Sequence, residues 1–326
     1  MTGCSTLWYT SATRVSPFRV AFASAARYAV PPGYLLNSNV RYPNLPTVGI
    51  TLGDVNGVGP EILLKASQDV ALIEWCVPVV YGSKEILDAV ADAARLPRLG
   101  WTVINRGNQS PELHPGQKRA DAGAASMAWL EAAVNDAIAG EIDAIATCPI
   151  SKENIRSAGY DFMGHTDYIA HRTGTDNYCM SLFAGNMRAI HVTGHMPLRE
   201  ALNVLDAPRI VAAIRLGHEA LIRIGIPKPR IAVAGLNPHA GENRVLGNED
   251  LDIVAPAVQQ ARGEGIECTG PHPPDTVFWR MQRGDADMVV ALYHDQGHIP
   301  MKLVAMDYGV NVTLGVPIVR TSVDHG

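Results

Sequence analysis

From Thr47 onward, the sequence alternates short runs of apolar residues with longer segments in which apolar residues recur at helical spacing. Continuous apolar runs are typical of strands that are buried on both faces, as in parallel sheets covered by helices. The alternation therefore predicts an α/β protein with a largely parallel sheet. The expected strands are 47–53, 77–82, 144–150, 188–193, 230–235, 288–293 and 310–315.

The segments between these runs predict helices, several of which have recognisable N-terminal ends. A helix over 60–75 would have a proline in its first turn, where proline is tolerated. Ser83 and Asp206 are N-cap residues for helices over 83–96 and 206–224, because a short side-chain oxygen can accept a hydrogen bond from a free N–H of the first turn. Two more helices are expected over 120–139 and 248–263.

Composition excludes several classes of protein. The 326-residue chain carries a net charge of −5, whereas nucleic-acid-binding proteins usually have a strong basic excess. The sequence has no stretch of about 18 apolar residues, so no membrane-spanning helix is expected. The five cysteines are scattered without a CxxC pair, which indicates reduced thiols in a reducing compartment. These properties predict a cytoplasmic protein without nucleic-acid or membrane partners.

The chain is long enough for two domains, and its first part differs in composition from the rest. The first 53 residues hold four arginines and no acidic residue. Residues 1–46 are therefore interpreted either as a disordered leader or as a targeting segment, which would make the protein organellar. The chain turns polar after residue 150, which predicts a first domain over 47–150 and a second over 151–302. The segment of about 303–326 could return to the first domain.

Three of the expected strands are followed by a histidine, namely His195, His239 and His294. The carboxyl ends of parallel strands share one edge of a sheet, and ligands bind at that edge. Three neutral imidazoles meeting there would form a metal site with an open position for substrate. The alternative for each of them is a hydrogen-bonded loop histidine. His191 alternates with apolar neighbours inside its strand and is interpreted as structural.

Signals for anion or cofactor binding are weaker. The segment "GDVNGVGPE" (53–61) is neither a GxGxxG fingerprint nor a P-loop, and a tight strand-to-helix turn is its favoured interpretation. No dinucleotide fingerprint is present elsewhere, so the cofactor-binding residues are unknown. Lys302, Asn311 and Arg320 flank the last two strands and are candidates for binding a phosphate or carboxylate. His165, in the glycine-containing turn "GHTD", is a further ligand candidate.

From about Thr47 to Gly326, the chain resembles the 4-hydroxythreonine-4-phosphate dehydrogenase (PdxA) family. The resemblance rests on seven ordered motifs: "GHTD", "HVTGHMPLREAL", "GLNPHAGE", "PPDTVF", "YHDQGHIPMK", "GVNVTLGVP" and "RTSVDHG". It implies a two-domain fold like that of isocitrate and isopropylmalate dehydrogenases, with the active site in the interdomain cleft. It also implies a homodimer with shared active sites, NAD or NADP, and one divalent metal ion, either zinc or magnesium or cobalt.

The motifs also imply roles for individual residues. The implied metal ligands are His195, His239 and His294. The implied substrate contacts are His165, Thr166, Lys302, Asn311 and Arg320. The catalytic candidates are Lys302, His165 and Asp275. Three imidazoles favour zinc or a similar transition metal. Gly297 is expected to let the chain turn sharply after the strand, and His298 stands where the resemblance asks for no histidine.

The chemistry implied by the resemblance is oxidation of a secondary alcohol β to a carboxylate, followed by loss of CO2. The expected substrate is 4-phosphooxy-threonine, in pyridoxal phosphate biosynthesis. The segment "GHIPMK", in place of "GLPVLK", resembles the branch that acts on 4-phospho-threonate or 4-phospho-erythronate. A third branch oxidises aromatic cis-dihydrodiol carboxylates. Two departures, "VNG" for "PAG" at 55–57 and the end of the chain soon after "RTS", leave an inactive truncated paralogue as the alternative of a different class.

Overall fold

The computed structural model describes residues 45–323, so the predicted leader over 1–46 lies almost entirely outside the described residues. The strands form one 11-stranded sheet in the order β3-β2-β1-β4-β11-β10-β5-β6-β9-β7-β8. Their bounds are β1 (Thr47–Thr51), β2 (Val77–Tyr81), β3 (Thr102–Ile104), β4 (Ala144–Thr147), β5 (Cys179–Ala184), β6 (Met187–His191), β7 (Ile231–Ala234), β8 (Cys268–His272), β9 (Met288–Ala291), β10 (Val310–Leu314) and β11 (Val319–Val323).

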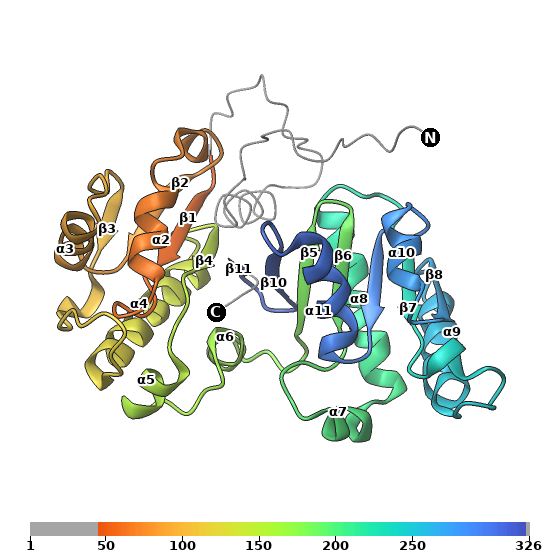
Figure 1. Ribbon diagram of the computed structural model, residues 1–326. Helices are drawn as coiled ribbons and strands as arrows, with labels where there is room; N and C mark the ends of the chain where they lie inside the picture. Colours follow the sequence, from red (N-terminus) through yellow and green to blue (C-terminus); the bar gives the residue numbers. More distant parts are fainter. Residues whose placement is uncertain (1–44, 324–326) are drawn as a thin grey trace, which may run out of the picture.

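Most neighbouring strands are parallel, which confirms the predicted α/β class. The exceptions lie in the middle of the sheet, where β10 is antiparallel to β11 and β5, and β5 is antiparallel to β6. Helices cover the strands, with α11 in front of β5 and β6 and α8 behind them (Figure 1). Among residues 45–323, no helix is both long and apolar enough to cross a membrane.

The helical segments are α2 (Gly59–Ala66), η1 (Val70–Glu74), α3 (Lys84–Ala94), η2 (Arg106–Asn108), α4 (Ala120–Ile138), α5 (Lys152–Ser157), α6 (His165–Thr173), α7 (Leu198–Val204), α8 (Ala207–Arg223), η3 (Pro238–Gly241), η4 (Asp250–Val254), α9 (Ala255–Gly263), α10 (Val277–Gln282) and α11 (His294–Ala305). The two predicted N-caps are confirmed: Ser83 accepts a hydrogen bond from the N–H of Ile86, and Asp206 accepts one from the N–H of Arg209. The helix predicted over 60–75 is wrong in part. It breaks where the Asp69 side chain accepts from the N–H of Ala71 and starts a separate 3-10 turn.

Strands β3, β5, β8 and β11 are absent from the sequence-based prediction. Strand β8 contains Gly270 and Pro271, and β11 reads "VRTSV", so neither shows a continuous apolar run. Yet Arg320 and its three following residues are buried, because β11 lies between β4 and β10 near the centre of the sheet. Burial here comes from tertiary position and not from side-chain polarity.

The C-terminal strands join two hydrophobic cores. Val316, Ile318 and Val323 pack in a core with residues of β1, β4 and α4, whereas β10 contributes to a second core with β6, β9 and α8. Strand β11 pairs with β4, the last strand of the 47–150 segment, and β10 pairs with β5. The division into domains near residue 150 stays a prediction.

The glycine-rich segment 53–61 forms the expected turn between β1 and α2. Gly53 has φ of +70°, and a Cβ at this position would lie 2.2 Å from the carbonyl oxygen of Pro149. The buried Asp54 carboxylate accepts hydrogen bonds from the N–H of Asn56 and from Nδ2 of Asn154. The turn is therefore held by Asp54 within it and by Asn154 of α5, which agrees with the structural interpretation of this motif.

Candidate active site

Five adjacent strands place a row of side chains on one face of the sheet. Arg320 on β11 lies opposite Thr313 on β10, and Thr313 lies opposite Met180 on β5. The ring of His191, at the end of β6, lies 3.2 Å from the carbonyl oxygen of Met180 and opposite Ala291 of β9. Residues in register on neighbouring strands point to the same face. The sheet therefore connects two polar groups, one around Arg320 and one around the histidines beyond β6 and β9.

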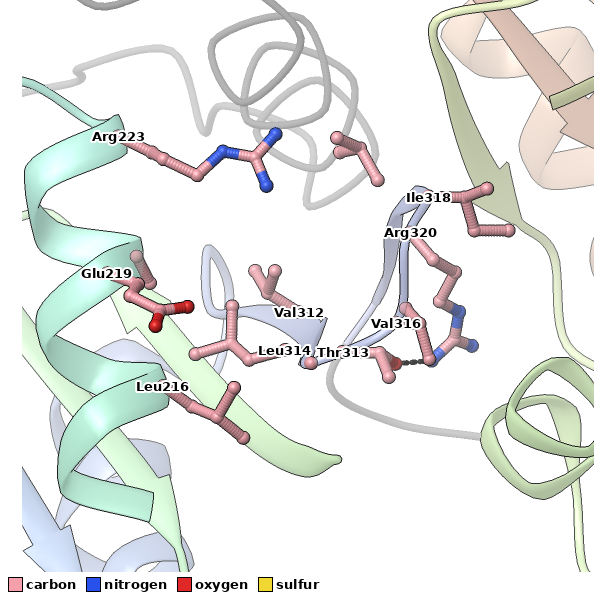
Figure 2. Close-up of a pocket in the computed structure, with 12 residues that line it drawn as sticks. Leu216, Glu219, Arg223, Val312, Thr313, Leu314, Val316, Ile318 and Arg320 are labelled. Atoms are coloured by element: carbon pink, nitrogen blue, oxygen red, sulfur yellow. Dashed lines mark hydrogen bonds between the residues drawn. The ribbon is translucent and has the colours of Figure 1, made fainter. Parts of the chain in front are cut away.

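The guanidinium of Arg320 is buried among threonine hydroxyls. It donates to Thr147 Oγ1 at 2.8 Å, to Thr313 Oγ1 at 3.2 Å and to Thr166 Oγ1 at 3.4 Å. Figure 2 shows the Arg320 guanidinium beside Thr313. Within residues 45–323, no carboxylate lies within ion-pair distance, and Nε has no hydrogen-bond partner. Burial lowers the pKa of Arg320 to about 10, which leaves it charged at neutral pH.

Two more predicted substrate contacts leave polar atoms without partners near this face. Nε2 of His165, at the start of α6, and Oδ1 of Asn311, on β10, are buried and accept or donate no hydrogen bond within the described chain. Burial, followed by the charge of Arg320, holds the pKa of His165 well below its usual range, so the imidazole is neutral. A buried cation and unpaired polar atoms are costly unless a polar ligand satisfies them. This group, which we call the Arg320 group (Thr147, His165, Thr166, Asn311, Thr313 and Arg320), is suited to an anionic ligand.

A second part of the site is a cavity of about 240 Å³ lined by His195 and His294. The two rings have centroids 4.9 Å apart. His294 Nδ1 lies 2.7 Å from Oδ1 of Asp295, so Nδ1 donates to this carboxylate and Nε2 remains as the acceptor. Burial, then the neighbouring His294, lowers the pKa of His195. Both imidazoles are thus suited to binding an electrophile or a divalent cation.

His239 does not join these two rings in the described chain. It lies in the exposed turn η3 after β7, with φ of 54°. No group of three or more His, Cys, Asp or Glu side chains within residues 45–323 is arranged to hold a metal ion. His195 and His294 come together within one chain, and both carry donor atoms that suit a metal ion. The three-histidine metal site, His239 included, stays a prediction.

His191, which is interpreted as structural from the sequence, and His298, for which no role is expected, belong to the same cluster. His298 Nδ1 lies 3.1 Å from His191 Nε2 and 3.1 Å from the carbonyl oxygen of His294. The rings of His294 and His298 are stacked, with centroids 3.7 Å apart and planes at 9°. The segment after β9 is thus the helix α11 and not the sharp turn expected at Gly297. Spacing of four residues between His294 and His298 was the available signal, because such pairs are neighbours on a helix.

Burial governs the protonation of this histidine pair. It lowers the pKa of His191 to about 3, with a further contribution from His298. It lowers the pKa of His298 to about 4, with further contributions from His294 and Lys302. Lys302 is half-buried on α11, one turn beyond His298, and its charge also acts on His195. Lys302 therefore lies near the histidine cluster, where it can face a bound anion.

The remaining catalytic candidate, Asp275, is exposed in the turn before α10, beside the edge strand β8. Its proposed role stays a prediction.

A small pocket of about 50 Å³ lies between α8 and the turn that connects β10 and β11. Figure 2 shows Glu219 and Arg223 of α8 on the side of this pocket away from Arg320. One water molecule needs about 10–15 Å³ by the same measure, so the pocket has room for a few water molecules. The cavity beside His195 and His294 is the larger of the two.

Comparison with known proteins places these features in context. Residues 74–326 match the family described as "Pyridoxal phosphate biosynthetic protein PdxA". The chain is 44% identical to a 4-hydroxythreonine-4-phosphate dehydrogenase of Desulfosudis oleivorans, over 86% of this chain and 88% of that protein. It is 41% identical to a D-threonate 4-phosphate dehydrogenase of Pectobacterium atrosepticum, over 86% and 90% respectively.

Solved structures agree with this similarity. A crystal structure of 4-hydroxythreonine-4-phosphate dehydrogenase from Klebsiella pneumoniae has a TM-score of 0.80 and 42% identity, over 86% of this chain and 90% of that chain. A terephthalate 1,2-cis-dihydrodiol dehydrogenase from Burkholderia xenovorans has a TM-score of 0.63 and 33% identity, over 87% and 90%. The same α/β fold thus occurs in proteins that are named for different substrates.

Proposed function

The chain belongs to the PdxA family of dehydrogenases, and we propose that it oxidises and decarboxylates 4-phosphooxy-threonine with NAD or NADP. The observation that carries the proposal is the buried guanidinium of Arg320, which has hydroxyl partners and no carboxylate within residues 45–323. A buried cation of this kind is stabilised when a substrate anion supplies the missing negative charge. A phosphorylated hydroxy acid carries two such groups.

The residues of this chain divide the work of binding between two places. Arg320, with Thr166 and Thr313, binds one anionic group of the substrate. Lys302, near the histidine cluster, offsets a second negative charge. The row of residues across β11, β10, β5 and β6 spans three strand spacings, so the backbones at its two ends are about 15 Å apart. The side chains that extend from both ends make the distance between their polar groups shorter. We propose that an extended four-carbon phosphorylated acid binds between the two ends of this row.

We propose that His195 and His294 hold a divalent ion, zinc or a similar metal, and that His239 of the partner subunit completes the ligand set. Two imidazoles that meet in one chain, and a third that does not, are expected for a site shared within a homodimer. The bound ion supplies Lewis acidity, which lowers the pKa of the substrate hydroxyl and polarises the resulting ketone. Asp295 fixes the tautomer of His294 that leaves Nε2 available.

Side chains of the protein carry out the proton transfer. Oxidation of the C3 hydroxyl releases one proton, and we propose that Lys302 or the neutral His165 receives it. The bound nicotinamide supplies the hydride acceptor. The β-keto acid that forms then loses its carboxylate as CO2, and the remaining enolate takes up one proton at carbon. A Lys302→Ala variant with full turnover would exclude Lys302 from proton transfer.

A second candidate substrate is D-threonate 4-phosphate or its erythronate analogue. Relatives named for D-threonate 4-phosphate are 40–41% identical to this chain, close to the identity of those named for 4-hydroxythreonine-4-phosphate. D-Threonate 4-phosphate has no ammonium group, whereas 4-phosphooxy-threonine has one. The positive charge of Lys302 lies beside the histidine cluster. This charge repels an ammonium group and therefore favours D-threonate 4-phosphate.

An assay of NADH or NADPH release tests the proposal. Purified protein loaded with Zn²⁺ or Co²⁺ is supplied separately with 4-phosphooxy-threonine, D-threonate 4-phosphate, D-erythronate 4-phosphate and an aromatic cis-dihydrodiol carboxylate. The proposal expects turnover with 4-phosphooxy-threonine, and higher kcat/KM for D-threonate 4-phosphate would favour the second candidate. Turnover with the dihydrodiol alone contradicts both. A folded dimer that turns over none of them is a non-catalytic paralogue.

A further inference from the structure

His191 and His298 form a buried imidazole pair behind His294. His191 is 2% exposed and His298 is 6% exposed, and His294 lies between this pair and the cavity. The ring centroids of His191 and His298 are 4.6 Å apart, and that of His191 is 6.2 Å from His294. The pair therefore lies between the sheet and the histidine that faces the cavity.

The hydrogen-bond partners determine which nitrogen donates in each ring. The carbonyl oxygen of Met180 can only accept, so His191 Nδ1 carries the proton. The carbonyl oxygen of His294 can also only accept, so His298 Nδ1 is a donor as well. His191 Nε2 is then left as the acceptor for His298 Nδ1, and one N–H is shared between two acceptors. A continuous chain of hydrogen bonds thus runs from the β5 backbone to His298.

Gly297 allows this arrangement within α11. A Cβ at position 297 would lie 2.3 Å from His191 Nε2 and 3.1 Å from Cβ of Ala291. Any other residue would push the helix away from the His191 ring. The close approach of α11 to β6 and β9 is therefore specific to a glycine at this position.

We infer that His298, held in place by His191, is a positioning residue that fixes the ring of His294. The flat face of His298 supports that of His294 at 3.7 Å, while Asp295 holds Nδ1 of the same ring. With one face and one nitrogen of the His294 imidazole engaged, Nε2 points in a single direction. The inference rests on the proposed role of His294 as a metal ligand, and it assigns a new role to two histidines.

Two substitutions separate the two contacts of His298. His298→Asn keeps a donor near the Nδ1 position and removes the stacking ring, whereas His298→Phe keeps a flat ring and removes the donor. The matched control is His171→Asn, an exposed histidine on α6. Circular dichroism and thermal unfolding establish that each variant is folded. Co²⁺ titration monitored by the visible absorption of the bound ion then reports ligand geometry.

The expected result is a loss of Co²⁺ affinity of about tenfold or more, with a shifted absorption band, in at least one His298 variant. The control keeps the wild-type affinity and spectrum. KM for the phosphorylated substrate stays near the wild-type value while kcat falls, because Arg320 is intact. A purely structural contribution of His298 would lower thermal stability without moving the cobalt spectrum.

Crystal structures of the two variants show the orientation of the His294 ring directly, so this measurement does not require a bound metal ion. The inference expects the His294 ring to change its orientation in at least one variant. An unchanged ring in both, with unchanged cobalt binding, overturns the inference and leaves the proposed function intact. Wild-type protein that binds no Co²⁺ overturns the metal part of the proposed function instead, and the position of the His294 ring then decides the inference alone.

Discussion

Arg320 donates to the hydroxyl of Thr147 across 2.8 Å, although 173 positions separate the two residues in the chain. The bond connects β11 to β4 and places the guanidinium at the centre of the sheet. No acidic side chain within the described residues neutralises it. The protein thus keeps a buried positive charge whose cost a substrate anion can offset.

Replacement of Arg320 by Met is expected to affect stability and activity in opposite directions. The free energy of unfolding should stay equal or rise by about 1–4 kcal/mol, because an unpaired buried charge is replaced by an apolar chain. The value of kcat/KM for a phosphorylated substrate should fall roughly thirtyfold or more, since a charge-assisted hydrogen bond contributes about 2 kcal/mol. Urea unfolding and steady-state kinetics measure the two effects. Arg223→Met, at an exposed position of α8, is the control. An equal loss of kcat/KM in both variants would contradict the assignment of Arg320.

Mixing two inactive variants tests the shared metal site. His195→Ala and His239→Ala homodimers should each bind little metal and show little turnover. If the ligands of one site come from two subunits, heterodimers of the two variants contain one intact site. Random mixing should then restore about one quarter of wild-type activity. Absence of recovery in dimers that mass spectrometry proves to be mixed would place all ligands in one subunit.

Acid should destabilise the metal-free protein through the buried histidine pair. The pKa of His191 is lowered to about 3 and that of His298 to about 4, whereas both titrate near 6.5 when unfolded. Below pH 6.5 the unfolded chain binds more protons than the folded one, so stability falls as the pH decreases toward 4. Each histidine contributes about 1.4 kcal/mol per pH unit within this window.

Urea unfolding of the metal-free protein at a series of pH values between 4.5 and 7 measures this slope. The double variant His191→Leu, His298→Leu is expected to show a flatter dependence than wild type. His171→Leu should keep the wild-type slope, since that ring is exposed. Equal slopes in the double variant and wild type would mean that the pair is not neutral in the folded state.

Gly297→Ala is expected to destabilise the protein, whereas alanine ordinarily stabilises a helix relative to glycine by about 1 kcal/mol. The new methyl group would overlap His191 Nε2, and overpacking of this kind costs about 1–3 kcal/mol. In a His191→Ala background the cost should largely disappear. Gly263→Ala is the matched control, because a Cβ at this last residue of α9 meets nothing within 4 Å. Thermal unfolding of wild type, Gly297→Ala, His191→Ala and the double variant measures the coupling.

The pattern of the sequence predicts much of the fold. The helix caps at Ser83 and Asp206 can be predicted because a cap bonds within one turn of the chain. The apolar strands can be predicted because burial on both faces requires a continuous run of apolar residues. Strand β11 has no continuous apolar run, since Arg320 and two hydroxyl residues occupy its centre. Its place between β4 and β10 depends on partners far away in the chain.

Some features of the candidate site can likewise be predicted from the sequence, and others cannot. The α/β class, the family and the polar residues at the strand ends can be predicted from residue type and from the order of residues along the chain. The contact between His191 and His298, which are 107 positions apart, could not be predicted in this way. The reason is physical: side-chain contacts depend on strand register and on the approach of α11 at Gly297, and both are set by packing between distant segments.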